Sequence, residues 1–338
     1  MSATPGTVDA AVDAVFARTT GRTLALLVMV DGRVMLERYG AQPASELGPE
    51  TEITASSSLI SWSMAKSITH GAIGLLVGDG LIDPEAPAPV REWAGTPKAA
   101  IRLIDLLEMR SGLRFLEEYV LGEPSDCIEM LWGSGQDDHA AYAAALALDH
   151  EPGTVWSYAS GTTNIICRIV GDVLSGDPDI PADERRRVVS EFLQDRLFTP
   201  AGMSGAEARF DTAGNVVGSS FVFATARDYA AFGELYRRDG VGPDGRRILP
   251  EGWAEHGRTF VAHDPDGTGP NGFDYGRHWW MWPEFPGSMA AHGFMGQFTL
   301  VVPDRSLTLV HLGLTERDHS RELVVALGDV VRAATPTR

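Results

Sequence analysis

The sequence predicts an α+β fold, in which one antiparallel sheet is built from both ends of the chain and is flanked by helices. Two observations carry this prediction. β-rich runs occur near the N-terminus and return after about residue 210, while helical patterns dominate the chain between them. We therefore expect a discontinuous sheet domain over residues 1–60 and 215–338. We expect a mostly helical domain over residues 61–214 to be inserted in it, with the functional site at their interface.

The N-terminal region is predicted to hold one helix and one hairpin. Apolar residues from Val8 to Phe16 recur at helical spacing, which indicates an amphipathic helix. Two β-rich runs follow, Thr23–Val30 and Val34–Tyr39, and Asp31-Gly32 between them is a strong signal for a tight hairpin turn. These runs supply the first two strands of the expected sheet.

The middle of the chain is predicted to be helical. A long helix is expected from Ser63 to Leu81, where the Gly78-Asp79-Gly80 turn ends it. Further helical patterns are separated by loops rich in turn-forming residues, and they cover Ile101–Met109, His139–Leu148, Thr163–Leu174 and Arg186–Leu197.

The last third of the chain returns to short β-like stretches with two more helices. The expected strands are Val216–Phe223, His278–Trp282, Gln297–Val302 and Leu307–Leu312. The expected helices are Arg227–Arg238 and Arg321–Arg332. In the strand around residue 280, Trp280 and Trp282 share one face and Trp279 takes the other. One of these faces either walls a cleft or belongs to the core.

The composition is that of an ordinary globular protein. Of 338 residues, 44% are hydrophobic and 22% are charged, which excludes a disordered or collagen-like chain. Acidic residues outnumber basic ones, 46 to 28, and the net charge of −18 argues against nucleic acid or an anionic membrane as a partner. Only two of the basic residues are lysines, Lys66 and Lys98.

Targeting signals and cysteines indicate the compartment. The first residues lack the apolar segment of a secretory signal, and no stretch approaches 18 uninterrupted apolar residues. Cys127 and Cys167 show neither CxxC nor zinc spacing. We therefore expect a cytoplasmic protein with no membrane association and two unpaired thiols.

The first candidate for chemistry is Ser63-Met64-Ala65-Lys66, at the head of the first long helix. Residues three apart lie on one face of a helix, so the serine hydroxyl and the lysine amine can meet. Such a pair makes a nucleophile and its base if the amine can release its proton, which a guanidinium does not do in proteins. The alternative is a capped helix start with a solvated lysine.

Further motifs follow Ser63-Met64-Ala65-Lys66 in a definite order, and together they carry a family resemblance. They are Asp105-Leu106-Leu107-Glu108-Met109-Arg110-Ser111-Gly112, Glu117-Glu118-Tyr119-Val120, Pro152-Gly153-Thr154-Val155-Trp156-Ser157-Tyr158-Ala159-Ser160 and Gly293-Phe294-Met295-Gly296-Gln297. The set resembles the serine β-lactamase and penicillin-binding superfamily. It resembles most closely the class C-like branch, which contains esterases and 6-aminohexanoate-dimer hydrolases. The resemblance implies a β-lactamase/transpeptidase-like fold.

The resemblance also implies catalytic roles. Ser63 would be the acylated nucleophile and Lys66 its base. Tyr158 would pass a proton to the leaving group and later activate the deacylating water. Because a free tyrosine has a pKa of about 10, Lys66 would have to assist it. The backbone N–H groups of Ser63 and Phe294 would form the oxyanion hole.

Four residues are candidates for binding substrate. Ser160 stands where many relatives of this branch have asparagine, and Gly293 permits close approach of a substrate along a strand. Tyr119 resembles a tyrosine on a mobile loop of the 6-aminohexanoate-dimer hydrolases, although a solvent-flanked loop tyrosine is equally expected. His292 either contacts substrate or is satisfied inside the sheet.

One position departs from the β-lactamase pattern. Alignment of the K-T-G motif on Gly293 puts Ala291 where that motif has lysine. In β-lactam-processing relatives this lysine helps to bind a substrate carboxylate. Its absence puts penicillin recognition in doubt and favours a less anionic ester or amide.

The sequence thus favours a serine hydrolase that cleaves a carboxylic ester or small amide, with no metal and no cofactor. A β-lactamase or D-alanyl peptidase of the same fold is the first alternative. A non-catalytic binding or sensor protein is the second, and an intact set of Ser63, Lys66 and Tyr158 argues against it. The oligomeric state stays open, and a homodimer is compatible with the sequence.

Overall fold

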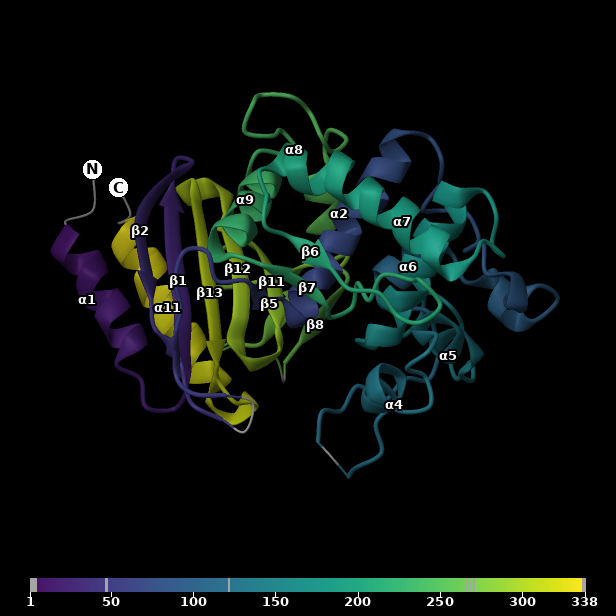
Figure 1. The fold of residues 1–338 in the computed structure, drawn as a ribbon, viewed down its shortest axis with the longest axis horizontal. Coiled ribbons are helices and arrows are strands. Elements are labelled where there is room, and N and C mark those ends of the chain that lie inside the picture. Colours follow the sequence, from purple (N-terminus) through teal and green to yellow (C-terminus); the bar gives the residue numbers. More distant parts are fainter. Residues whose placement is uncertain are drawn as a thin grey trace.

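The computed structural model describes residues 5–45, 48–120, 122–265, 267, 269 and 271–335. Eight antiparallel strands form the main sheet in the order β2-β1-β13-β12-β11-β10-β9-β8, so the first two strands lie beside the last (Figure 1). The predicted α+β fold, with a sheet made from both ends of the chain, is confirmed. The strands are β1 Arg22–Val30, β2 Arg33–Tyr39, β8 Ala262–Asp264, β9 Phe273–Tyr275, β10 Trp280–Met281, β11 Met289–Gly293, β12 Gln297–Val302 and β13 Leu307–Leu314.

Both faces of the central strands are buried. In β1, Leu26 and Val28 belong to one apolar cluster, and Ala25 and Leu27 belong to the other. This alternation is the period of two of a strand. Helices α1 (Pro5–Phe16) and α11 (Ser320–Ala334) cover the first face and pack against each other, while α9 (Ala226–Arg237) packs on the second (Figure 1).

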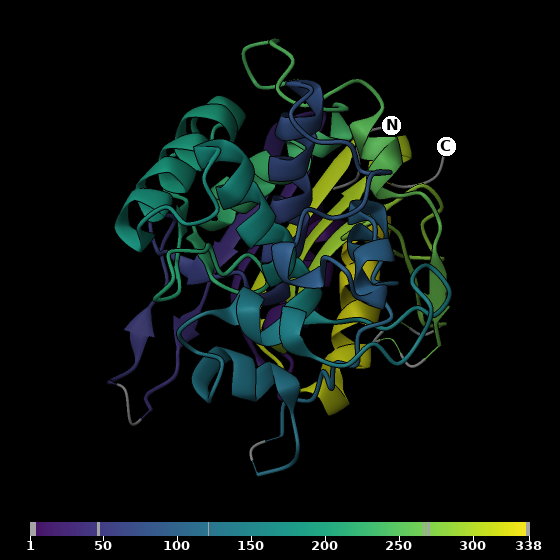
Figure 2. The same ribbon diagram turned by 90° about the vertical axis from the view of Figure 1, so that its right-hand side faces the viewer.

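A group of helices forms the other half of the molecule, in front of the sheet in Figure 2. Its centre is α6, whose residues from Ser160 to Cys167 are all buried and which contacts α2, α3, α4, α5 and α7. The helices are α2 Ala65–Gly78, α3 Leu103–Leu107, α4 Asp126–Trp132, α5 His139–Ala145, α6 Ser160–Ser175 and α7 Ala182–Phe192, which continues as a π-helical turn over Leu193–Phe198. The domain boundaries near residues 61 and 214 stay a prediction.

The expected helices are present with shifted ends, but one predicted strand is wrong. Val216–Phe223 is mostly a turn, because the backbone N–H groups of Ser220 and Phe221 both donate to the carbonyl of Val217. Only β7, at Val222–Ala224, is extended there. It lies in a small separate sheet with β5 (Leu59–Ile60) and β6 (Glu207–Ala208).

Several short elements were not anticipated from the sequence. Helix α4 is one of them, although Ser125 caps it by accepting a hydrogen bond from the backbone N–H of Ile128 at 3.0 Å. The other short elements are α8 Thr199–Ala201, α10 Trp253–Gly257, β3 Ala41–Gln42 and β4 Thr51–Glu52, with 3₁₀ turns at Trp62–Met64, Arg91–Trp93, Pro97–Ala100, Phe294–Gly296, Pro303–Arg305 and Arg317–His319.

Cys127 and Cys167 are both buried and are not joined to each other. Burial raises the pKa of the Cys167 thiol to about 12. No helix among the described residues is both long enough and apolar enough to cross a bilayer.

Four buried histidines make the stability of the fold depend on pH. Burial lowers the pKa of His139 and His311 to about 4 and that of His278 to about 3, and it lowers the pKa of His70 well below its usual value. Asp211 acts in the opposite sense, since burial raises its pKa to about 6.

We predict that the free energy of unfolding falls as the pH is lowered from about 6.5 toward 4. In that window the unfolded chain protonates these histidines and the folded chain does not, so each contributes up to about 1.4 kcal/mol per pH unit. Asp211 binds its proton more tightly when folded and therefore offsets at most one of them. Urea unfolding at pH 7.5, 6.5 and 5.5 measures the slope, and His139→Gln should reduce it. Equal stability at all three values would contradict this account.

Candidate active site

A tight turn presents Ser63 ahead of α2. The 3₁₀ turn η1 covers Trp62–Met64, and Trp62 has a φ of +44°, which is rare for a non-glycine residue. The buried Ser61 hydroxyl fixes this turn: it donates to the carbonyl of Ser220 at 3.1 Å and accepts from the backbone N–H of Val222 at 3.1 Å. The nucleophile candidate therefore sits on a rigid element.

The Lys66 amine is enclosed by three oxygens. Its side chain is only 2% exposed, and Nζ lies 2.9 Å from Ser63 Oγ, 3.0 Å from Ser160 Oγ and 3.0 Å from the carbonyl oxygen of Ser219. The alternative of a solvated lysine is therefore wrong. The residue spacing read from the sequence brings the hydroxyl and the amine into direct contact.

Tyr158 stands over this pair. Lys66 Nζ lies 4.8 Å from the centre of the Tyr158 ring, and the ring packs against Trp280 and Tyr275. Burial raises the pKa of the Tyr158 hydroxyl, whereas the positive charge of Lys66 acts to lower it. Tyr158 is thus held as a neutral phenol that can donate a proton, beside an amine that favours its ionised form.

Glu117 is a site residue for which the sequence analysis assigned no role. Its carboxylate accepts hydrogen bonds from the backbone N–H and the hydroxyl of Ser160, both at 2.6 Å, and from the Tyr119 hydroxyl at 2.6 Å. A carboxylate at the first residue of α6 also suits the positive end of the helix dipole. Glu117 thereby orients Ser160, which contacts Lys66. Its place in the Glu117-Glu118-Tyr119-Val120 motif was the available signal.

Gly293 and the turn after it lie against the nucleophile. A Cβ on Gly293 would be 2.3 Å from the carbonyl oxygen of Ser61 and 3.1 Å from the backbone nitrogen of Ser63, so only glycine fits. This is the close approach expected from the sequence. It brings the end of β11 beside one of the two predicted oxyanion donors.

The carbonyl groups of the turn Phe294–Gly296 are all bound on the side of the sheet. The carbonyl of Phe294 accepts from Gln297 Nε2 at 3.1 Å, and that of Met295 accepts from the backbone N–H of Thr315 at 3.0 Å. The carbonyl oxygen of Gly296 lies 2.6 Å from His311 Nδ1. These contacts fix the turn that follows the N–H of Phe294. The carbonyl that shares a peptide plane with this N–H is that of Gly293, and Gly293 is held in the sheet by its pairing with Gln297. Such preorganisation is what an oxyanion hole requires.

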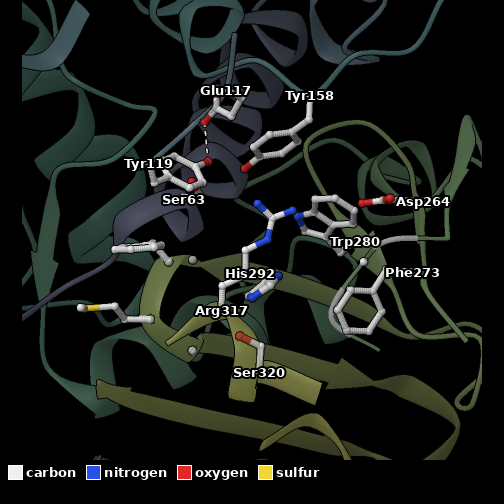
Figure 3. A pocket seen from close by; sticks show the side chains of 15 residues that line it. Ser63, Glu117, Tyr119, Tyr158, Asp264, Phe273, Trp280, His292, Arg317 and Ser320 are labelled. Atoms are coloured by element: carbon white, nitrogen blue, oxygen red, sulfur yellow. Dashed lines mark hydrogen bonds between the residues drawn. The ribbon is translucent and has the colours of Figure 1, made fainter. Parts of the chain in front are cut away.

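Most of the predicted site residues line one cavity of about 230 Å³ (Figure 3). Ser63, Tyr119, Tyr158, His292, Gly293 and Phe294 contribute to it, together with Glu117 and Trp280. His292 stacks on Phe298 with ring centres 4.2 Å apart, and burial lowers its pKa to about 3. It is therefore a neutral wall of the cavity. Trp280 walls the cavity as well, whereas Trp279 and Trp282 belong to the two cores.

Arg317 also lines this cavity and was not a candidate from the sequence. It is exposed and its side chain reaches in between Tyr158 and His292 (Figure 3). Ala291, at the position of the K-T-G lysine, is buried at 1% exposure. Among the described residues, no group of three His, Cys, Asp or Glu side chains could hold a metal ion.

Comparison with known proteins places this geometry in a family. The sequence profile of the Beta-lactamase family matches residues 8–334. The chain belongs to the Beta-lactamase family. The resemblance drawn from the ordered motifs is thereby confirmed, and the serine, lysine and tyrosine cluster occupies the interior of a member of this family.

One curated relative and two solved structures of similar fold are compared with this Beta-lactamase family member. The 6-aminohexanoate-dimer hydrolase of Paenarthrobacter ureafaciens is 26% identical over 271 residues, which is 74% of this chain and 64% of that protein, so the match spans less than two thirds of its length. A family VIII carboxylesterase superposes with a TM-score of 0.70 at 15% identity, covering 96% of this chain and 97% of its own. A penicillin-binding protein homologue from Pyrococcus abyssi has a TM-score of 0.68 at 16% identity, over 98% and 79% of the two chains.

We predict that Gly293→Ala lowers kcat by about 100-fold, the effect of losing one oxyanion donor. The added methyl group would push β11 away from Ser61 and Ser63. Ala290→Gly, in the same strand, is the control and should retain activity. Far-ultraviolet circular dichroism and thermal unfolding check that both variants fold. A folded Gly293→Ala variant with unchanged kcat would show that this contact does not position the oxyanion hole.

Proposed function

We propose that this chain is a serine hydrolase that cleaves a carboxylic ester or a small linear amide through an acyl-enzyme on Ser63. The observation that carries the proposal is the 2.9 Å contact between Ser63 Oγ and the buried Lys66 Nζ, with Tyr158 beside both. A nucleophile, a base in hydrogen-bond reach and a second proton carrier are the groups that acyl transfer needs.

Acylation uses these groups in order. Ser63 Oγ attacks the carbonyl carbon of the substrate, and its proton passes to Lys66 Nζ, which enters this step as the neutral amine. The N–H groups of Ser63 and Phe294 stabilise the negative charge that forms on the carbonyl oxygen. Tyr158 then donates its proton to the departing alcohol or amine. The C–O or C–N bond breaks, and the acyl group remains as an ester of Ser63.

Deacylation returns the protons. Tyr158, now a phenolate beside protonated Lys66, removes a proton from the attacking water. The ester bond to Ser63 breaks as the serine oxygen takes a proton from Lys66. The carboxylic acid leaves, and all three side chains recover their starting states. Burial of the Tyr158 ring and the charge of Lys66 act on the tyrosine in opposite directions, which suits a group that must both give and take a proton.

Two observations support an ester or amide over a β-lactam. The position of the K-T-G lysine is held by the buried Ala291, so a β-lactam carboxylate would meet no cation on β11; Arg317, which lines the cavity, comes from a different element. In addition, the relative from Paenarthrobacter ureafaciens is named for a linear amide dimer. We propose that short esters and small linear amides are the substrates.

We predict that Ser63→Ala lowers hydrolysis of p-nitrophenyl esters at least about 1000-fold, because the nucleophile is lost. A fluorophosphonate probe should label the native protein at Ser63, and mass spectrometry should locate the adduct. Nitrocefin and linear amide dimers are assayed in parallel. Ester turnover that survives Ser63→Ala would overturn the assignment. Absence of both labelling and turnover in the native protein would favour a binding or sensor protein, and efficient nitrocefin turnover a β-lactamase.

We predict that Lys66→Arg keeps the positive charge and the fold but lowers the acylation rate about 100-fold or more. A guanidinium does not take up the serine proton, and removing a general base costs on this order. Pre-steady-state release of p-nitrophenol measures acylation separately from turnover. Lys98→Arg, at the other lysine of the chain, is the matched control and should behave as the native protein. An unchanged burst rate in Lys66→Arg would refute the role of Lys66.

A further inference from the structure

Two cavities meet at Ser63, and Tyr158 lines the larger of them. The second has a volume of about 120 Å³ and is lined by Ser63, Ser160, Ser220 and a set of apolar side chains. These apolar side chains are Trp62, Cys127, Ile128, Leu131, Trp132 and Phe294, and Tyr119 lines both cavities. Tyr158, Glu117 and Arg317 line the larger cavity and not this one.

One face of α4 forms much of the wall of the smaller cavity. Cys127 and Leu131 are four residues apart, as are Ile128 and Trp132, so the four side chains lie together on the helix surface. Helix α4 is held in place at its start, where the Asp126 carboxylate accepts from the Tyr142 hydroxyl at 2.8 Å and from the backbone N–H of Leu116 at 2.7 Å. The wall is therefore fixed.

The smaller cavity carries no charged side chain. Cys127 is 3% exposed, and burial raises the pKa of its thiol, so it stays protonated. Trp62 closes one side with its ring edge-on to Phe294, at a centre distance of 5.8 Å, and to Trp132, at 6.4 Å. Trp132 is 54% exposed and stands at the rim of this aromatic group. An apolar group of limited size is the ligand that such a cavity favours.

The proton path decides which half of a substrate enters which cavity, and this step rests on the proposed function. The leaving group must receive a proton from Tyr158, and Tyr158 lines only the larger cavity of the two. The carbonyl carbon sits at Ser63, where both cavities begin. The alcohol or amine therefore occupies the larger cavity, and the acyl chain extends into the smaller one.

We propose that the cavity formed by α4, Trp62 and Phe294 is the acyl pocket, and that it selects an uncharged acyl chain of about four to five carbons. A cavity of about 150 Å³ in another protein holds benzene, so 120 Å³ suits a slightly smaller group. Each methylene that enters should raise kcat/KM about fourfold, until the pocket is full. A terminal ammonium is disfavoured, because the lining of this cavity holds no carboxylate: Glu117 lines only the larger cavity and is already bound to Ser160 and Tyr119.

The test measures kcat/KM for p-nitrophenyl esters from acetate to decanoate. We expect about a 15-fold rise from acetate to butanoate, an optimum at butanoate or pentanoate, and a fall from octanoate onward. The 6-aminohexanoate ester should react at least tenfold more slowly than the hexanoate ester. A profile that is flat, or that still rises at decanoate, would overturn the assignment of the pocket.

Variants of α4 test which of the two cavities holds the acyl chain of the substrate. Leu131→Ala should move the optimum to hexanoate or longer, and Ile128→Phe, at a partly exposed position, should move it to acetate. Met130→Leu is the matched control, since Met130 is buried on the same helix but does not line the cavity, and it should leave the profile unchanged. A shift caused by Trp280→Leu but by neither α4 variant would place the acyl chain in the larger cavity and overturn the proposal.

The outcome for the pocket is separable from that for the reaction. If the native protein hydrolyses esters and is labelled at Ser63 but shows no chain-length optimum, the pocket assignment fails alone. If no ester reacts and no probe labels Ser63, the proposed function fails, and the pocket assignment fails with it.

Discussion

A lysine amine that is almost completely buried must find its hydrogen-bond partners inside the protein, because an unpaired buried charge costs several kcal/mol. Lys66 finds them on three separate segments: the turn at Ser63, the first residue of α6 at Ser160, and the carbonyl of Ser219. The contact therefore fixes α2, α6 and the segment before β7 relative to one another. It also explains the turn at residues 217–221, which directs a carbonyl group at the amine instead of continuing a strand.

The part of the site that follows from local spacing could be read from the sequence. Ser63 and Lys66 are three residues apart, so a helix brings them together wherever it lies. Tyr158 and Phe294 could be named only through ordered motifs, since no local rule places them beside Ser63. Glu117 reaches Ser160 across 43 residues, and Arg317, in the 3₁₀ turn before α11, lines the same cavity as Ser63 from a distant part of the chain. Such placements are set by tertiary packing.

The elements of the fold divide in the same way, into those that the local sequence predicts and those that it does not. Long elements with a clear period, such as β1, β13 and α11, were predicted within a few residues, because many side chains repeat the signal. Strands β8 and β9 span only three residues each, too few for an alternation to be seen. Helix α4 spans seven residues and gives no clear signal in the sequence, although it forms much of the wall of the smaller cavity beside Ser63. Short elements thus contribute more to the site than to the sequence signal.

The position of β13 in the sheet has a consequence for how the chain folds. This strand lies between β1 and β12, and Arg22 pairs with Leu314, almost three hundred residues later. The hairpin of β1 and β2 therefore cannot pair with β13 until nearly the whole chain has been synthesised. Contacts between such distant residues slow folding and leave strand edges open in the meantime. During synthesis, the unpaired edge of β1 is therefore the part of the sheet most exposed to aggregation, and it is the part that a chaperone would shield.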